Sequence, residues 1–226
     1  MSGWGSFILA AAAFFLSHTI PVRSSAKPWI VARIGAKGFG LIYSILSLVI
    51  FVWLIVAANR APYVPLWEKA AWMPYVTISI MFVVCLMLSF SIARPNPFSF
   101  GGARNESFEP AHPGIVRLTR HPLLVALALW SFAHLLPNGD LSHVILFAAF
   151  GIFALLGCKM INQRTRRKMS EVDKDYDALW VATRAGSLLS GCENSASVFL
   201  RLLGGLGLYV LLLSLHGPVI GVYVWP

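Results

Sequence analysis

The chain has 226 residues, of which 58% are hydrophobic and only 12% are charged, whereas about a quarter of the residues in a soluble domain are charged. This composition excludes an ordinary soluble domain and predicts an integral membrane protein. The formal net charge of +9 does not by itself indicate nucleic-acid binding, because the basic residues of a membrane protein gather in the loops on one side of the bilayer.

Six apolar runs predict an all-α, polytopic transmembrane bundle of about six spans. A helix needs roughly 20 apolar residues to cross a bilayer core, and the fourth run is short for this unless its flanking residues lie near the interface. No basic residue precedes the first run and several follow it, the reverse of a signal peptide, so we expect it to be retained. The runs are residues 4–22, 38–58, 71–92, 123–136, 141–161 and 198–215.

The basic residues lie almost entirely in the loops after the first, third and fifth runs. The other connections contain only Arg60 and Lys69. Because cytoplasmic loops are enriched in Lys and Arg, these three loops are predicted to be cytoplasmic and both termini non-cytoplasmic. We divide the chain into a membrane domain of five spans with its loops, residues 1–197, and an additional C-terminal transmembrane helix, residues 198–226.

The two long cytoplasmic loops are where a site could be built. Four prolines keep residues 94–113 out of helix. After the fifth run, apolar residues recur at steps of three or four with charges between them, which predicts an amphipathic helix that either anchors at the membrane surface or covers a site. Its apolar positions are Ile161, Thr165, Met169, Val172, Tyr176 and Leu179 or Trp180.

The histidines fall into two groups by predicted depth. His18 and His121 both lie near the cytoplasmic ends of their spans, and two imidazoles at one depth can be opposing axial ligands of a haem iron. His134 lies about 20 Å along the helix from His121 and cannot share that iron with it. With His143 and His216 it belongs to the other end of the bundle, where these histidines form either a second site or interfacial polar residues.

The last span and the cysteines carry weaker signals. Gly204, Gly205 and Gly207 would permit close helix packing, within this chain or against another copy of it. The cysteines, Cys85, Cys158 and Cys192, are odd in number and widely spaced, so they predict neither a disulfide framework nor a zinc site.

Three stretches resemble the NnrU-like family of membrane proteins. They are FFLSH at residues 14–18 with Arg23 after it, LIYSILSL at residues 41–48, and TRHP at residues 119–122 running on to WSFAHLLPNGD at residues 130–140. The resemblance extends over most of residues 7–183 and leaves the last span outside. It implies a multi-pass protein of the bacterial inner membrane, in a family named from gene clusters for nitrite and nitric oxide reduction.

A plant relative of that family, 15-cis-zeta-carotene isomerase, binds haem b through histidines and isomerises a double bond in a lipophilic polyene. The resemblance therefore implies haem b as cofactor, with His18 and His121 as iron ligands and catalytic residues, one of which leaves the iron. His134 would be an exchange ligand, and Arg120 and Arg117 would bind the haem propionates. The implied partners are the lipid bilayer and a lipophilic small molecule or nitric oxide, and not nucleic acid.

Arg120-His121-Pro122 at the start of a span is also similar to the isoprenylcysteine carboxyl methyltransferase group. That resemblance implies an S-adenosylmethionine pocket lined by Arg120, His121 and residues 161–176. The sequence departs from the pattern at Asn162, where an acidic residue is expected, because a carboxylate binds a cationic cofactor more strongly than an amide. A third hypothesis is a non-catalytic haem sensor or assembly factor for nitric oxide metabolism.

Overall fold

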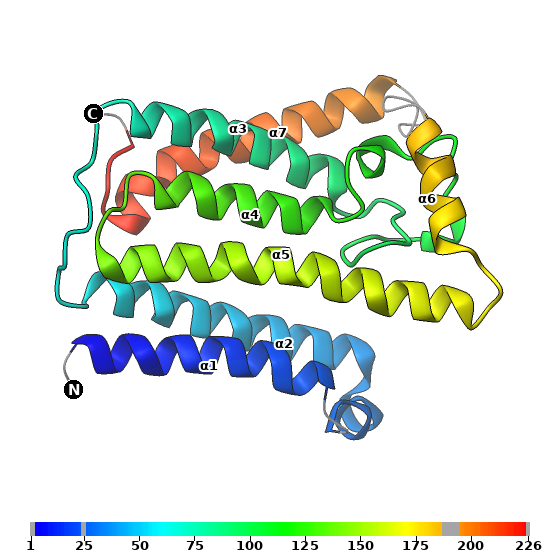
Figure 1. Ribbon diagram of the computed structural model, residues 1–226, viewed down its shortest axis with the longest axis horizontal. Helices are drawn as coiled ribbons and strands as arrows, with labels where there is room; N and C mark the ends of the chain where they lie inside the picture. Colours follow the sequence, from blue (N-terminus) through cyan, green and yellow to red (C-terminus); the bar gives the residue numbers. More distant parts are fainter. Residues whose placement is uncertain (1–2, 24–25, 187–194, 225–226) are drawn as a thin grey trace. The chain divides into compact units, whose positions relative to one another are not determined.

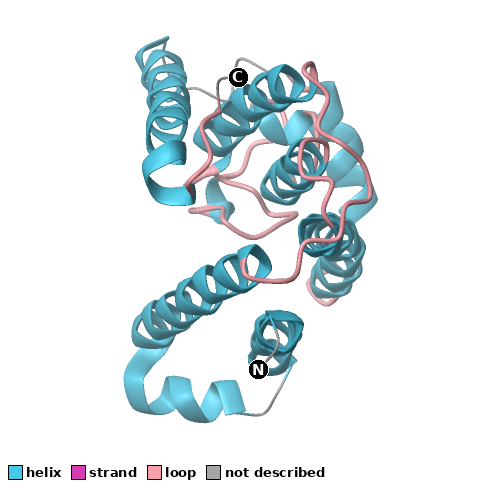
Figure 2. Cartoon of the chain, turned by 90° about the vertical axis from the view of Figure 1, so that its left-hand side faces the viewer, coloured by secondary structure: helices cyan, strands magenta, loops and turns pink. Residues whose placement is uncertain are grey.

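A computed structural model of the protein describes residues 3–23, 26–186 and 195–224. These residues form helices and loops, with one isolated bridge between Pro65 and Asp140, which confirms the all-α prediction (Figures 1 and 2). The α-helices are α1 (Gly3–Arg23), α2 (Ala26–Asn59), α3 (Met73–Ser91), α4 (Pro122–Leu135), α5 (Leu141–Ser170), α6 (Tyr176–Ala185) and α7 (Ser195–Leu215).

Within the described residues, four helices are long and apolar enough to cross a membrane. They contain Lys37–Asn59, Met73–Ser91, Leu141–Ser170 and Ala196–Ile220. Two further apolar helices, Gly3–His18 and Pro122–Leu135, are shorter. Membrane helices are therefore supported at four of the six predicted positions, and the six-span topology with both termini non-cytoplasmic stays a prediction.

The chain forms two compact units. The first contains α1, α2, the loop after α2 and the beginning of α5, that is Met1–Trp67 and Gly139–Leu146. Within it α1 packs along α2, and the rings of Phe14 and Phe51 are 6.3 Å apart. The buried side chains of this pair are Phe7, Ala10, Phe14, Leu54, Ala57 and Ala58.

The second helix begins earlier than its apolar run. The run starts at residue 38, whereas α2 starts at Ala26 and bends at Gly35, whose φ is 73° and ψ is 164°. This backbone conformation is open to glycine but costly for other residues. The connection between the first two runs is therefore largely helical, and Gly35 is the point where it changes direction.

Asp140 joins the start of α5 to the end of α2. Its Oδ1 accepts hydrogen bonds from the backbone N–H groups of Ser142 at 3.1 Å and His143 at 3.4 Å. The ring of His143 pairs through Nδ1 with Asp140 and reaches Oδ1 of Asn59 through Nε2 at 2.9 Å. The Ser142 hydroxyl lies 2.9 Å from the carbonyl of Ala58. These polar residues thus connect the start of α5 to the end of α2 within the first unit.

Replacing Asp140 by alanine is expected to destabilise the protein by about 1 kcal/mol, because the N-terminal N–H groups of α5 lose their acceptor. Burial raises the pKa of Asp140, but hydrogen bonds from Ser142 and the charge and bonds of His143 lower it further, so the pKa lies below its ordinary value. The contribution of the carboxylate is therefore present above pH 4, roughly its unfolded pKa, and is lost as the pH falls through the folded value.

Unfolding in detergent at pH 3 to 7 measures both the stability lost in Asp140→Ala and the pH dependence of the wild-type stability. Asp140→Asn is the matched control, since asparagine also caps helices but does not titrate. In this variant the loss of stability that Asp140 causes at low pH should disappear. An Asn variant that loses stability with acid as steeply as the wild-type protein would contradict this.

The second unit contains α3, α4, the rest of α5, α6 and α7, that is Glu68–Asn138 and Phe147–Pro226. Helix α3 packs against both α4 and α7, and the Thr77 hydroxyl on α3 donates to the Ala133 carbonyl on α4 at 2.7 Å. On α4, Trp130 packs edge to face on Phe147 and Phe150 of α5. A domain boundary at residue 197 stays a prediction, and α7 is part of this unit.

Close helix packing by glycines is confirmed between α7 and α3. A Cβ atom added to Gly204 or Gly205 would lie within 3.1 Å of a side-chain atom of α3, whereas Gly207 has no atom within 4 Å. Cys85 and Cys158 carry free thiols, and Cys192 lies outside the described residues.

Candidate functional site

The predicted amphipathic helix is in fact two helices. Helix α5 ends at Ser170, Asp173 adopts a left-handed φ of 52°, and α6 begins after Asp175. The Asp175 carboxylate accepts hydrogen bonds from the N–H groups of Ala178 and Asp177, which lower its pKa. A side-chain N-cap of this kind stabilises the start of a new helix. The predicted continuous helix over residues 161–180 is therefore wrong at this turn.

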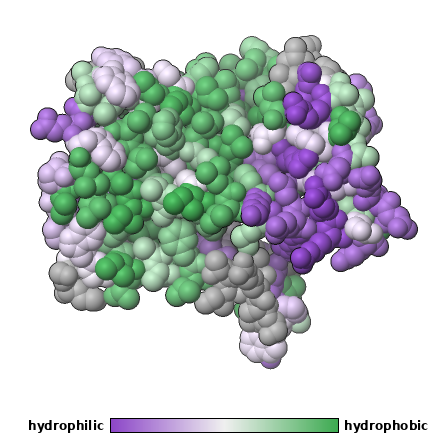
Figure 3. Space-filling model, in the orientation of Figure 1, coloured by the Kyte–Doolittle hydropathy of each residue, from purple (hydrophilic) through white to green (hydrophobic). Residues whose placement is uncertain are grey.

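Most of the predicted apolar positions nevertheless pack inward, whereas Val172 is exposed. Met169 and Tyr176 form a cluster with Phe98 and Val116 from the loop between α3 and α4, and Leu179 and Trp180 pack against it. The Phe98 ring is fully buried, with centroids 5.4 Å from Tyr176 and 5.5 Å from Trp180, edge to face. Figure 3 shows hydrophilic side chains gathered on the surface of this end of the second unit.

His121 lies beside this cluster, just before α4, and is 3% exposed. Its Nε2 is 2.9 Å from Oδ1 of Asn162 on α5, which also accepts a hydrogen bond from the Tyr176 hydroxyl. Its Nδ1 is 3.0 Å from the hydroxyl of Ser99. Because the amide oxygen only accepts, Nε2 carries the proton and Nδ1 accepts from Ser99. Both ring nitrogens are thus engaged inside the protein.

The charge state of His121 follows from its surroundings. Burial lowers its pKa, the hydrogen bond to Asn162 opposes this, and the charge of Arg120 lowers it again, so the net pKa is below the ordinary value. His121 is therefore neutral at neutral pH, as the hydrogen-bond pattern requires.

Arg120 packs on the aromatic residues of α6. Its guanidinium is 4.9 Å from the ring centre of Tyr176 and 4.6 Å from that of Trp180, both within range of a cation–π interaction. Burial raises the pKa of Tyr176, more than the nearby Arg120 lowers it. The Arg117 side chain donates to the carbonyl of Arg184 at 3.3 Å. Arg117 and Arg120 thus connect α6 to the loop before α4. Binding of the haem propionates by these two arginines stays a prediction.

His18 belongs to the first unit. Its Nδ1 is 2.7 Å from the carbonyl of Phe14, one turn earlier on α1, and its ring stacks on that of Phe14 at 4.1 Å. The ring of Tyr43 on α2 approaches it edge to face at 5.8 Å. Since a carbonyl only accepts, Nδ1 carries the proton and the lone pair of the neutral ring is on Nε2.

His134 and His216 come together at the other end of the second unit. His134 is near the end of α4, and His216 begins a short π-helix after α7, His216–Ile220. Their ring centroids are 6.4 Å apart and their planes are 25° from parallel. Nδ1 of His134 is 2.9 Å from the carbonyl of Trp130, and Nδ1 of His216 is 2.7 Å from that of Val222. Both rings therefore have their lone pair on Nε2.

The predicted depths of the histidines placed His134 and His216 at the same end of the bundle. They did not predict that the two rings lie together, because the bend after α7 has no periodic signal in the sequence. His143, assigned to the same group, lies in the first unit with Asp140. The pairing of His18 with His121 joins residues of different units and stays a prediction. The partners of His121, Ser99 and Asn162, were not identified as site residues from the sequence.

Comparison with known proteins supports the resemblance. The sequence model of a family described as NnrU protein matches residues 6–224. This match covers nearly the whole chain and includes α7, which the motifs alone left outside. Searches of curated proteins and of solved structures found no match.

Proposed function

Because the chain belongs to the NnrU protein family, we propose that it is an inner-membrane protein that binds haem b through histidine ligands. The observation that carries this proposal is the His134 and His216 pair. In metal-binding histidines the second ring N–H is normally donated to a carbonyl or carboxylate, which fixes the ring and directs the other nitrogen at the metal. In both rings Nδ1 donates to a backbone carbonyl, which leaves Nε2 as the nitrogen that could bind a metal.

The spacing of the two rings also fits. A metal lies about 2.0–2.1 Å from an imidazole nitrogen, so two rings on opposite sides of one ion have their centres roughly 6 Å apart. The centroids of His134 and His216 are 6.4 Å apart. The His134 ring lies among the aromatic rings of Trp130 and Phe147, which are suitable neighbours for an apolar porphyrin.

The environment of His121 fits ligation less well. A lone pair on Nδ1 faces Ser99 and the proton on Nε2 faces Asn162, so an iron would have to replace one of these buried hydrogen bonds. In the first unit, His18 presents the same tautomer as His134 and His216, whereas the two ring nitrogens of His143 contact Asp140 and Asn59. The sequence-based pair and the pair in the second unit are therefore separate ligand hypotheses.

A bound haem would supply an iron for electron exchange or for binding nitric oxide or a polyene double bond. The carbonyls of Trp130 and Val222 would orient the two imidazoles. His216 is the one we expect to leave, because it lies on a short π-helix and His134 is held within α4. Isomerisation of a lipophilic polyene and nitric-oxide-linked chemistry are the two activities that this arrangement would serve.

The test is the absorption spectrum of the haem-supplemented protein with four alanine variants. We expect a low-spin Soret band that is lost in His134→Ala and shifted towards a high-spin spectrum in His216→Ala. His121→Ala should keep the low-spin Soret band if the protein stays folded, which circular dichroism checks. Loss of the bands in His18→Ala and His121→Ala, with His134→Ala and His216→Ala unchanged, would instead support the sequence-based pair.

A second candidate is binding of S-adenosylmethionine beside Arg120 and His121. The observation that favours it is that Arg120, His121, Asn162 and Tyr176 converge at one end of α4, where the methyltransferase resemblance places the cofactor. Against it, the Asn162 oxygen is already used by His121 and Tyr176. Calorimetry with S-adenosylmethionine tests this candidate independently of haem binding. No heat of binding at millimolar cofactor would reject it.

A further inference from the structure

Helix α5 extends well beyond the part that a bilayer needs. It has 30 residues, which is about 45 Å at 1.5 Å per residue, whereas the hydrocarbon core is about 30 Å thick. Its sequence changes from apolar to basic over the last third. The exposed side chains along one side are Ile152 and Leu156, then Met160, and then Arg164, Arg167 and Lys168.

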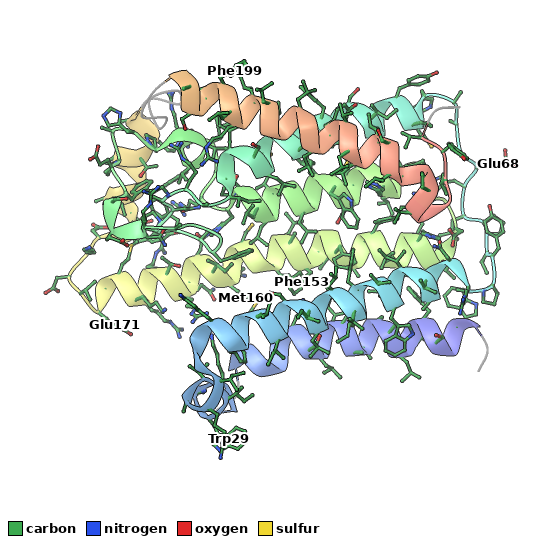
Figure 4. All side chains as sticks on the ribbon, turned by 180° about the vertical axis from the view of Figure 1, so that it is seen from behind. Trp29, Glu68, Phe153, Met160, Glu171 and Phe199 are labelled. Atoms are coloured by element: carbon green, nitrogen blue, oxygen red, sulfur yellow. The ribbon has the colours of Figure 1, made fainter. Side chains whose placement is uncertain are left out.

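These residues form a stripe that winds slowly around α5, because most of them are four residues apart and a helical turn has 3.6 residues. Together they border a shallow hollow of about 390 Å³, lined by Met160, Gln163, Arg164, Arg167, Lys168 and Glu171. Figure 4 labels Met160 on α5 and Glu171 just after the end of this helix. Three cations and one carboxylate line this hollow, so it attracts anions.

The three cations have no hydrogen bond or ion pair within the described part of the chain, although Glu171 is one turn away from Arg167 and Lys168. Arg166, on the other side of α5, is different. Its guanidinium pairs with Asp177 of α6 at 2.7 Å and lies 5.2 Å from the ring centre of Tyr176. Arg166 therefore binds α6, whereas Arg164, Arg167 and Lys168 are exposed on the other side of α5.

We propose that this face of α5 binds an acidic phospholipid, with the phosphate on Arg164, Arg167 and Lys168 and the acyl chains along Met160, Leu156 and Ile152. The occupant is a lipid and not a soluble anion, because the cations continue an exposed apolar stripe that runs along a membrane helix. Basic residues next to a spanning helix are the usual recognition element for acidic headgroups. The proposal does not depend on haem binding.

The test measures binding of phosphatidylglycerol to the full-length protein in neutral detergent, by native mass spectrometry and by the shift in unfolding temperature. Phosphatidylcholine and inorganic phosphate are the comparison ligands. We expect selective binding of phosphatidylglycerol, roughly fivefold weaker for each cation changed to glutamine. Since these side chains are exposed, the triple variant should unfold like wild type without added lipid.

Arg166→Gln is the matched control, because it removes the same charge from the opposite side of α5. It should weaken lipid binding less than Arg167→Gln does. Equal effects of these two changes, wild-type binding by the triple variant, or no preference for phosphatidylglycerol over phosphatidylcholine would each overturn the proposal. Displacement of the lipid by an equal concentration of inorganic phosphate would also overturn it, since the site would then recognise a free anion.

Discussion

Asn162→Ala is expected to lower the free energy of unfolding by roughly 2–4 kcal/mol, because one oxygen serves two buried partners and each group left without its bond costs about 1–3 kcal/mol. Those partners are Nε2 of His121 and the hydroxyl of Tyr176. Their loss would also loosen α6 from the loop before α4. The measurement is denaturant or thermal unfolding in detergent, followed by circular dichroism and intrinsic tryptophan fluorescence.

The neighbouring Gln163→Ala is the control, since Gln163 is exposed and substitutions at such positions usually change stability by less than about 0.5 kcal/mol. Combining Asn162→Ala with Tyr176→Phe should be less damaging than the sum of the single changes, because the Phe variant no longer leaves a hydroxyl unsatisfied. Additive effects would show that the two side chains do not share the oxygen, and a cost for Asn162→Ala no larger than that for Gln163→Ala would contradict the prediction.

Features with a periodic signal were predictable from the sequence. Apolar length located the helices at residues 38–58, 71–92, 141–161 and 198–215 to within a few residues at most ends. The inward positions Met169 and Tyr176 were also correct, although the helix containing them breaks at Asp173. Helix α6 begins at a local N-cap, Asp175. Such a cap stabilises the start of a helix by about 0.5–2 kcal/mol, and it has no signal in the apolar period.

The candidate site was less predictable, because side-chain pairing depends on how helices rotate and on how loops fold back. His121 was singled out from the sequence, but its two partners were not: they are Ser99, in a proline-rich loop, and Asn162, on a helix 41 residues later in the chain. His216 approaches His134 only through the π-helix after α7. A sequence gives the depth of such residues in a bundle, whereas their contacts need the packed structure.

The packing of α7 on α3 leads to a second large effect, at Gly205. A Cβ atom there would lie 2.8 Å from Cδ2 and 3.2 Å from Cα of Leu86, and 3.4 Å from the carbonyl oxygen of Cys85. The Leu86 side chain can rotate, but its backbone cannot move without shifting α3. Gly205→Leu is therefore expected to cost about 3 kcal/mol or more, at the upper end of overpacking effects. Thermal unfolding in detergent measures this cost.

Gly205→Ala and Gly207→Ala separate packing from helix propensity. Alanine favours a helix over glycine by about 1 kcal/mol at either position, so any difference between the two variants comes from their neighbours. Gly207 has no atom within 4 Å of an added Cβ, and its alanine variant should be as stable as wild type or more stable. Gly205→Ala should be clearly less stable than Gly207→Ala. Equal stability of the two variants would contradict a close approach of α7 to α3 at Gly205.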